Sequence, residues 1–475
     1  MCIRDSRRID PQAVYDFVAM SIIPSPLTVY CRVRKVPAHH VLEFDGQVSL
    51  GPYCRLTFPE DADISPDEMG REVRRVITGA VARRRRSDPP DARIGAFLSG
   101  GLDSSTVVGA LTAGGDRPTR AFSIGFSEPR FDEMDYARLA AEHFGAEHHT
   151  HVVTAAEMSA AVDDILDQYD EPFGNSSAVG VYSCARLAGR VGVNTLYAGD
   201  GGDEIFAGNP HYLTNRYFQF YHAVPGWLRR GVVEPVVFGC PLGGRIGLIR
   251  KARSYIRRAN TPNPERLAGY EFLEATAPHE VFRADFLARV DPTHPMLVRR
   301  QHYDRAGESS ELAHILCQDL ALVVSDNDLR KVTEMCTRAG IRVVYPMLDP
   351  EVVALASRIP APWHLRGLKL RAFYKRAMRG FLPPEILAKR KRGFGLPVGV
   401  WLRDDPSLGA RVRDAFAGRA ATEVFKEGFL SDLLHRMRTD QTNYYGAIVW
   451  VVLILVEWLS RHGCRGASVD WGSSP

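Results

Sequence analysis

The chain has 475 residues, of which 45% are hydrophobic and 24% charged, and its formal net charge is +4. This composition is that of a soluble globular protein, long enough for one large domain and a smaller piece. So small a net charge argues against a nucleic-acid-binding protein. The eight cysteines are scattered without any Cys-x-x-Cys pair, which disfavours a disulfide framework or a zinc site and favours reduced thiols in the cytoplasm.

The two ends of the chain predict neither a catalytic domain nor a membrane anchor. Residues 1–8 are polar as a segment and lead into a helix that is entered at Pro11, and residues 1–6 are interpreted as foreign to the segment that follows. Cys2 has the position of an N-terminal nucleophile, but residues 3–60 are too few to build an amide-hydrolysing site around its thiol. The apolar run 447–456 is about half the ~20 residues needed to cross a bilayer, so it predicts a buried helix.

From residue 66 onward, apolar strands alternate with amphipathic helices. This alternation predicts an α/β fold with a parallel sheet, right-handed crossovers and helices on both faces, followed by a helical C-terminal part. Residues 210–310 form a helical insertion that is rich in arginine and aromatic residues. The predicted strands are residues 94–98, 121–125, 149–153 and 195–198, and the predicted helices are residues 69–85, 104–113, 133–144, 156–169, 179–191, 311–322 and 328–338.

The first motif with chemical content is Ser99-Gly100-Gly101-Leu102-Asp103-Ser104, between the strand 94–98 and the helix that follows. A buried strand, a glycine-rich turn and a helix N-terminus together make an anion site, because unpaired N–H groups point outward there. The glycines let the backbone approach a phosphate closely. The serines add hydroxyl donors, and the Asp103 carboxylate can hold a magnesium ion between phosphate oxygens. The Walker pattern does not occur in the chain.

The second motif is Gly199-Asp200-Gly201-Gly202-Asp203-Glu204, which again follows an apolar strand. Three acidic side chains in five residues repel one another unless a cation neutralises them, and magnesium with nucleotide phosphates is the natural candidate. A calcium loop is the rival interpretation. It is disfavoured because the acids do not follow EF-hand spacing and a strand rather than a helix leads into them.

The first motif resembles the pyrophosphate loop of the ATP pyrophosphatase superfamily. Together, the two motifs resemble the synthetase domain of asparagine synthetases and their relatives, including the β-lactam synthetases. The resemblance extends over residues 66–459, and residues 9–53 resemble the end of the glutaminase domain that precedes it in that family. It implies an adenine nucleotide alpha hydrolase-like fold. The domains expected are a glutaminase remnant at residues 1–60, a synthetase domain at residues 66–460 and a tail at residues 461–475.

The resemblance assigns roles to individual residues. For the nucleotide it implies backbone contacts to adenine from Leu98 and Ile124, a lining position for Gly199, and pyrophosphate binding by Ser99, Gly100, Gly101, Asp103 and Ser104. For the metal it implies Asp103 and Asp203. The catalytic residues that it implies are Asp103, Asp200 and Lys391. Many relatives have Glu at the position of Asp200, and Lys391 lies in the loop Arg390-Lys391-Arg392-Gly393-Phe394-Gly395. The acceptor-binding residues that it implies are Glu204 and Asp328.

Some positions near the expected acceptor site depart from the family pattern. Thr333 and Glu334 stand where relatives often have an Asp-Arg pair. Arg342 and Val344 stand where relatives have a glutamate and an arginine, at a point where two helices are expected to meet. Because both halves of an Arg–carboxylate pair are lost, we expect a rewired contact rather than a broken one.

The resemblance implies an asparagine synthase that uses ATP and Mg²⁺. L-Aspartate would be adenylated with release of pyrophosphate, and ammonia, drawn from glutamine in the intact family members, would displace AMP. No nucleic acid or membrane partner is expected, and a homodimer is left open. Two alternatives stay open: an amidotransferase or tRNA-modifying enzyme acting on another acceptor, and a non-catalytic nucleotide-binding relative. The tRNA interpretation lacks a basic RNA platform and catalytic cysteines.

Overall fold

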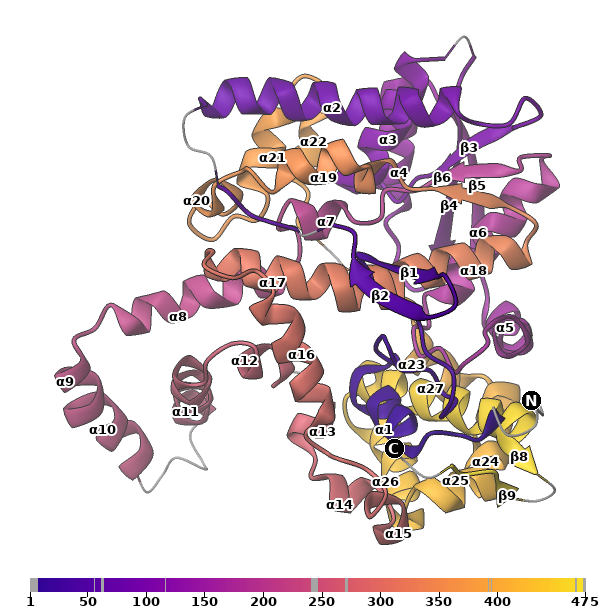
Figure 1. Cartoon of the computed structure of the whole chain (residues 1–475), viewed down its shortest axis with the longest axis vertical. Helices are drawn as coiled ribbons and strands as arrows, with labels where there is room; N and C mark the ends of the chain where they lie inside the picture. Colours follow the sequence, from indigo (N-terminus) through magenta and orange to yellow (C-terminus); the bar gives the residue numbers. More distant parts are fainter. Residues whose placement is uncertain are drawn as a thin grey trace.

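The computed structural model describes residues 7–54, 56–60, 64–115, 117–240, 247–269, 272–391, 393, 395–465 and 468–472 (Figure 1). Cys2, Arg392 and Phe394 therefore lie outside the described residues. The N-terminal segment forms helix α1 (Pro11–Met20) and the antiparallel hairpin of β1 (His40–Phe44) and β2 (Val48–Pro52).

A five-stranded parallel sheet forms the centre of the upper part of the molecule. Its order is β5-β4-β3-β6-β7, with β3 (Ile94–Phe97), β4 (Arg120–Phe126), β5 (Glu147–Val153), β6 (Thr195–Tyr197) and β7 (Arg342–Val344). Ala96 in the central strand pairs with Ala121 on one side and with Tyr197 on the other. The predicted parallel sheet is confirmed.

Helices cover both faces of this sheet, as predicted. Successive strand residues enter different cores: Leu196 packs in the core shared with α5, α6 and α18, whereas Tyr197 packs in the core shared with α2, α3 and α4. This is the alternation that a strand buried on both faces must show. The covering helices are α2 (Pro66–Arg86), α3 (Leu102–Ala113), α4 (Met134–Phe144), α5 (Ala155–Gln168), α6 (Ala178–Arg190), α18 (Arg330–Arg338), α19 (Pro350–Ala356) and α21 (Ala372–Ala377).

Two local predictions were wrong. Residues 342–344 do not lie where two helices meet but form β7, which pairs in parallel with β6. A three-residue strand is too short to show a periodic pattern in the sequence. It is recognised as a strand only by its hydrogen bonding to its neighbour. The predicted interruption between helices 311–322 and 328–338 is also absent, because α17 (Glu311–Asp319) continues through a π-helix (Leu320–Leu329) into α18.

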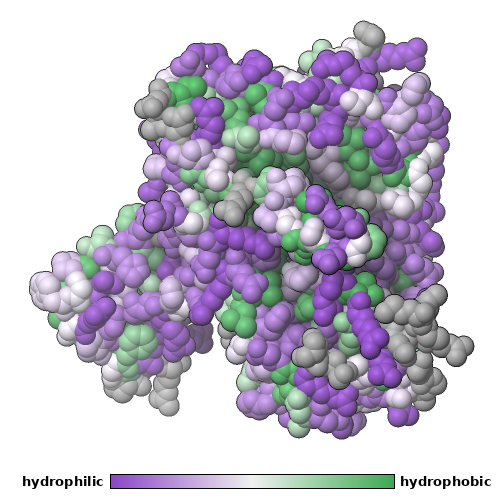
Figure 2. Space-filling model, in the orientation of Figure 1, coloured by the Kyte–Doolittle hydropathy of each residue, from purple (hydrophilic) through white to green (hydrophobic). Residues whose placement is uncertain are grey.

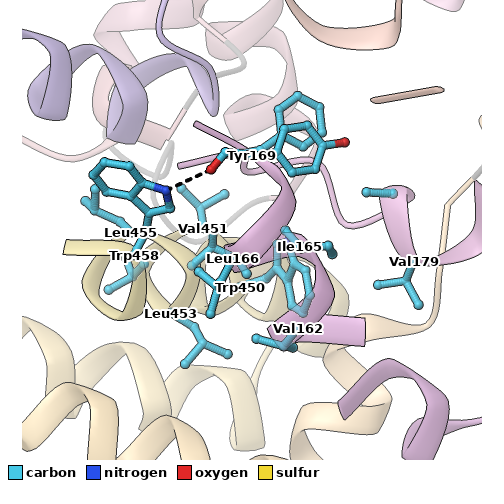
Figure 3. Packing of buried hydrophobic residues seen from close by; sticks show 14 of the residues in the cluster. Val162, Ile165, Leu166, Tyr169, Val179, Trp450, Val451, Leu453, Leu455 and Trp458 are labelled. Atoms are coloured by element: carbon cyan, nitrogen blue, oxygen red, sulfur yellow. Dashed lines mark hydrogen bonds between the residues drawn. The ribbon is translucent and has the colours of Figure 1, made fainter. Parts of the chain in front are cut away.

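The C-terminal helices pack below the sheet around α27 (Thr442–Trp458), which is longer than the apolar run that predicted it (Figure 1). The segment Thr442–Gly463 is long and apolar enough to pass as a membrane span, with a mean hydropathy of 1.5, but 67% of it is buried inside the protein. Trp458 Nε1 donates to the carbonyl of Tyr169 at 3.2 Å, and Trp450 is buried beside α5 (Figure 3). These contacts identify α27 as a core helix.

The insertion projects from the body as an arm (residues 214–260), drawn at the lower left of Figure 1. It contains α8 (Thr214–His222), α9 (Gly226–Leu228), a π-turn (Arg229–Val233), α10 (Glu234–Gly239) and α11 (Gly247–Asn260). The remaining elements are α7 (Gly202–Ile205), 3-10 turns at Pro210–Leu213 and Pro346–Leu348, α12 (Glu265–Ala268), α13 (Phe272–Ala275), α14 (Pro278–Val281), α15 (Ala284–Leu287), α16 (His294–Asp304), α20 (Ala361–His364), α22 (Pro384–Ala388), α23 (Val398–Asp404), α24 (Pro406–Ala417), α25 (Arg419–Val424), α26 (Glu427–Thr439), a π-turn at Leu459–Gly463, β8 (Cys464–Arg465) and β9 (Ser468–Val469).

Candidate active site

The two glycine-rich motifs meet at the carboxyl ends of β3 and β6. The chain leaves β3 toward β4 on one side, whereas β6 and β7 lie on the other, so the order reverses between β3 and β6. Ligands of open parallel sheets bind at such a reversal. A cleft of about 2440 Å³ opens there. The sequence-predicted residues that line it are Leu98, Ser99, Gly101, Asp103, Ser104, Ile124, Gly199, Asp200, Asp203 and Lys391.

The first loop is held in one tight conformation. Gly100 has a φ of +65°, and a Cβ there would lie 2.4 Å from the backbone of Tyr136 and Ala137, so only glycine fits. The Ser99 N–H donates to Ser104 Oγ at 3.2 Å. Gly101 precedes the first turn of α3 and gives that helix no side-chain cap. The N-terminal N–H groups of α3 are thus left for an anion.

The second loop packs directly on the first. A Cβ at Gly199 would lie 2.7 Å from the Ser104 nitrogen, and one at Gly202 would meet the Asp103 carboxylate at 2.3 Å. These glycines therefore bring Asp103 and the acids of the second loop together. On the other side, Lys389 Nζ donates to the carbonyl of Gly100 at 3.2 Å and pairs with Glu133 at 3.1 Å, which anchors the first loop.

A buried arginine joins the two proposed metal ligands. Arg371 Nη1 donates to Asp103 at 2.7 Å and to Asp203 at 2.9 Å, and Nη2 donates to the Gly202 carbonyl at 3.1 Å. Lys391 also pairs with Asp203. The Arg371 side chain is only 4% exposed, so the four side chains form a nearly buried cluster of two positive and two negative charges.

The pKa values of the two carboxyls move in opposite directions. Burial raises the pKa of Asp103 more than Arg371 lowers it. Burial also acts upward on Asp203, but Arg371 and Lys391 outweigh it and lower its pKa. Two carboxylates and a carbonyl oxygen around one point are a donor set that suits Mg²⁺, and here the Arg371 guanidinium supplies the positive charge at that point.

A second buried cluster surrounds Lys331. Its ammonium donates to Asp328 Oδ1 at 2.6 Å; burial acts to lower the Lys331 pKa, but Asp328 and Asp200 outweigh it and raise it. Burial raises the pKa of Asp200 to about 6, and burial together with Asp203 raises that of Glu204 to about 8. Among the described residues, Asp200 and Lys331 line the cleft, whereas the predicted acceptor residues Glu204 and Asp328 do not, and Asp328 meets the lining through Lys331.

The backbone of Leu98 has few hydrogen-bonding positions left for a ligand. Its N–H donates to the Phe122 carbonyl at 2.8 Å, and its carbonyl accepts from Ser123 Oγ. The second lone pair of that carbonyl is left for an adenine amino group. Contact of Leu98 and Ile124 with adenine stays a prediction.

The residues that depart from the family pattern have new partners. Thr333 Oγ1 lies 2.8 Å from the Tyr345 hydroxyl, and Gln168 Nε2 donates to Glu334 at 2.9 Å. Arg342 pairs with Asp88, and Val344 is buried. Each of these polar side chains has a partner in this structure, and the rewiring relative to the family stays a prediction.

Sequence reasoning missed Arg371, Lys331 and Lys389 as site residues. Arg371 is 168 positions from Asp203, just before α21, and nothing in its neighbourhood marks it as a partner of the acids. Lys389 and Lys331 carry a weak signal, because each lies within three residues of a position that was singled out, Lys391 or Asp328.

The parallel sheet and its paired loops, placed where the strand order reverses, define a PP-loop nucleotide-binding protein of the adenine nucleotide alpha hydrolase type. The family model for asparagine synthase matches residues 72–460, and the chain belongs to this family. Membership of this family indicates a ligase-type enzyme that forms amides in an ATP-dependent reaction.

Similar proteins include asparagine synthetases by name. The chain is 25% identical over 463 residues to asparagine synthetase [glutamine-hydrolyzing] 1 of Bacillus subtilis, covering 97% of this chain and 70% of that protein. It is 27% identical over 464 residues to a putative asparagine synthetase [glutamine-hydrolyzing] of Mycobacterium tuberculosis, covering 95% and 67%. A putative asparagine synthetase [glutamine-hydrolyzing] 2 of Methanocaldococcus jannaschii is 34% identical over 230 residues, covering 48% and 44%.

Proposed function

We propose that this protein adenylates the carboxylate of a small acceptor, L-aspartate in the first instance, and forms an amide with ammonia. The observation that carries the proposal is the convergence, in one cleft, of the uncapped N-terminus of α3 with Asp103, Asp203 and Lys391. An anion-binding helix end, paired carboxylates and a lysine are the groups that this chemistry needs.

The first half of the reaction is adenylation. The loop N–H groups with Ser99 and Ser104 bind the β- and γ-phosphates of ATP, and the adenine lies toward Leu98 and Ile124. Asp103 and Asp203 would hold Mg²⁺, which supplies charge neutralisation at the phosphates. An acceptor carboxylate oxygen attacks the α-phosphorus, and the bond to pyrophosphate breaks. Lys391 and the N–H groups stabilise the charge that leaves with pyrophosphate.

The second half is amide formation. Ammonia attacks the acyl carbon, a proton moves to Asp200, and the bond to AMP breaks. With a pKa of about 6, Asp200 is ionised near neutral pH and still basic enough to accept a proton. Asp328 acts on the acceptor through Lys331, whose ammonium it positions, and Glu204 stays a proposed acceptor residue. Free ammonia serves this chain, and glutamine serves where a glutaminase domain is present.

A related function is favoured by the rewired region. Thr333 and Glu334 bond to neutral partners, Tyr345 and Gln168, where many relatives have an Asp-Arg pair. These changes favour an amidotransferase acting on another carboxylate. A relative that binds ATP without turnover is the remaining alternative.

The test is pyrophosphate release from MgATP and ammonium, with L-aspartate, with other amino acids and with no acceptor. Aspartate-dependent release together with asparagine formation supports the proposal. The control is Asp103→Asn, which should fold but release no pyrophosphate. Release with another acceptor alone would establish the amidotransferase, and tight ATP binding without release under any acceptor would establish the non-catalytic relative.

A further inference from the structure

The arm (residues 214–260) differs in charge from the rest of the molecule. It contains nine Lys and Arg residues and a single acid, Glu234, which gives a net charge of +8. Because the whole chain has a net charge of +4, the other residues together carry −4. A local excess of this size marks a surface that meets anions.

The arm has a small core of its own, which fixes its helices against one another. Phe218 and Tyr221 of α8 pack with Ile256 and Ala259 of α11. Arg253 of α11 donates to the carbonyls of Val237 and Phe238 at 2.9 Å, so it ties α11 to the end of α10. The outward faces of these helices are therefore held in a defined arrangement.

One outward face is apolar. Trp227 and Val232 are five residues apart across the π-turn, and Val236 follows four residues later, so the three side chains lie along one side of the α9–α10 helix. Trp227 is 74% exposed and Val236 is 67% exposed. Leu248, at the start of α11, is 77% exposed. Several large apolar side chains this exposed on one projecting segment mark an interaction surface.

The outward face of α11 is basic. Arg250 and Lys251 recur seven residues later as Arg257 and Arg258, a spacing that places all four on one helical stripe, and all four are exposed. Figure 2 shows hydrophilic and hydrophobic atoms side by side on the arm, at the lower left. The arm thus presents a basic stripe on α11 and exposed apolar side chains on a projection whose base, at Tyr217 of α8, lines the cleft.

We propose that the arm binds an anionic phospholipid membrane surface, with the exposed basic stripe of α11 on the lipid phosphates and Trp227, Val236 and Leu248 in the interfacial layer. Basic helices with exposed tryptophan and aliphatic side chains have the chemistry of interfacial binding. A nucleic acid would use the charges but leave the exposed apolar side chains in water. A second copy is disfavoured because two arms of +8 repel one another. This inference does not rest on the proposed function, and it replaces the expectation that the protein has no membrane partner.

The experiment is co-sedimentation of the full chain with vesicles of phosphatidylcholine alone and with about 30% phosphatidylglycerol. We expect binding only to the anionic vesicles, weakened by salt. Because each basic residue contributes about fivefold to such binding, Arg250→Gln with Lys251→Gln should weaken it roughly 25-fold. Trp227→Ser with Val236→Ser should weaken it without changing the charge.

The matched control is Arg71→Gln with Arg438→Gln, which removes the same charge from exposed positions outside the arm and should leave binding unchanged. Unchanged circular dichroism in all variants shows that folding is intact. Three results would overturn the proposal: no binding to anionic vesicles, equal loss in the control, or binding to a single-stranded RNA or self-association in place of vesicle binding. Vesicle binding is measured independently of pyrophosphate release, so a negative result for one proposal does not refute the other.

Discussion

Arg371 is expected to take the place of a divalent cation between Asp103 and Asp203, and its replacement by methionine tests this. Arg371→Met removes the guanidinium but keeps a long side chain, which leaves Asp103 facing Asp203 with Lys391 still paired to Asp203. Removing one partner from a buried ion cluster costs about 3–5 kcal/mol. An entropy of unfolding of about 2.1 cal/mol/K per residue gives about 1 kcal/mol/K for this chain, so the melting temperature should fall by about 3–5 °C.

Magnesium should reverse this loss in the variant. A cation that binds the native state stabilises it by mass action, and in the variant the site between the carboxylates is no longer occupied by the guanidinium. The assay is thermal unfolding of wild type and variant in EDTA and in excess Mg²⁺, without nucleotide. Arg342→Met is the control, because it also breaks a pair with a buried aspartate, Asp88, but leaves that aspartate without a second carboxylate. A variant that melts like the wild type, or that gains no more from Mg²⁺ than the control, would refute the reasoning.

Three further predictions follow from the site. Asp200→Asn should lower ammonia-dependent turnover about 10²–10⁴-fold. The wild-type rate should fall as pH drops below about 6, because the Asp200 carboxylate, whose pKa is raised to about 6, is then protonated and cannot act as a base. A pH–rate profile that is flat down to pH 5 would exclude this role. Glu204 is neutral when folded but ionised when unfolded between pH 4.5 and about 8, so stability should fall as pH rises through that window, and Glu204→Gln should flatten the dependence measured by melting temperature. Gly199→Ala should abolish ATP binding measured by calorimetry, because its Cβ would lie 2.7 Å from the Ser104 nitrogen, whereas Gly428→Ala, which meets nothing within 4 Å, should bind ATP normally.

The sheet and its two loops could be predicted because their signals are local. A buried strand such as β3, followed by Leu98, is a run of apolar residues, and the glycines of each loop indicate a turn before a helix. The position of each strand in the sheet then places both loops at one edge. β7 could not be found this way, since Arg342–Val344 is shorter than a period and is a strand only because β6 lies beside it.

The charge balance of the site could not be predicted, because it depends on residues that only the fold brings together. The acidic residues Asp103 and Asp203 indicated in the sequence that a cation must neutralise them, and magnesium was the cation predicted. The structure adds Arg371 from a distant turn, and its guanidinium pairs with both acids. An acidic cluster in a sequence therefore indicates that positive charge is needed, and the fold shows which side chains contribute to it.

The charges that line the cleft narrow the class of acceptor further than the departures from the family pattern do. Thr333 and Glu334 lie outside the lining among the described residues, so they act on the acceptor only through the position of α18, whose Lys331 reaches the cleft. Lys331 offers a partner for a carboxylate, and Asp200 offers one for an ammonium group. An amino acid acceptor has both groups and would match this pair, whereas a sugar acid has only the carboxylate and would leave Asp200 facing Lys331 alone, the residue whose pKa it already raises. Under the proposed function this pair suits an amino acid as the acceptor, and Thr333 and Glu334 would bear on which amino acid it is.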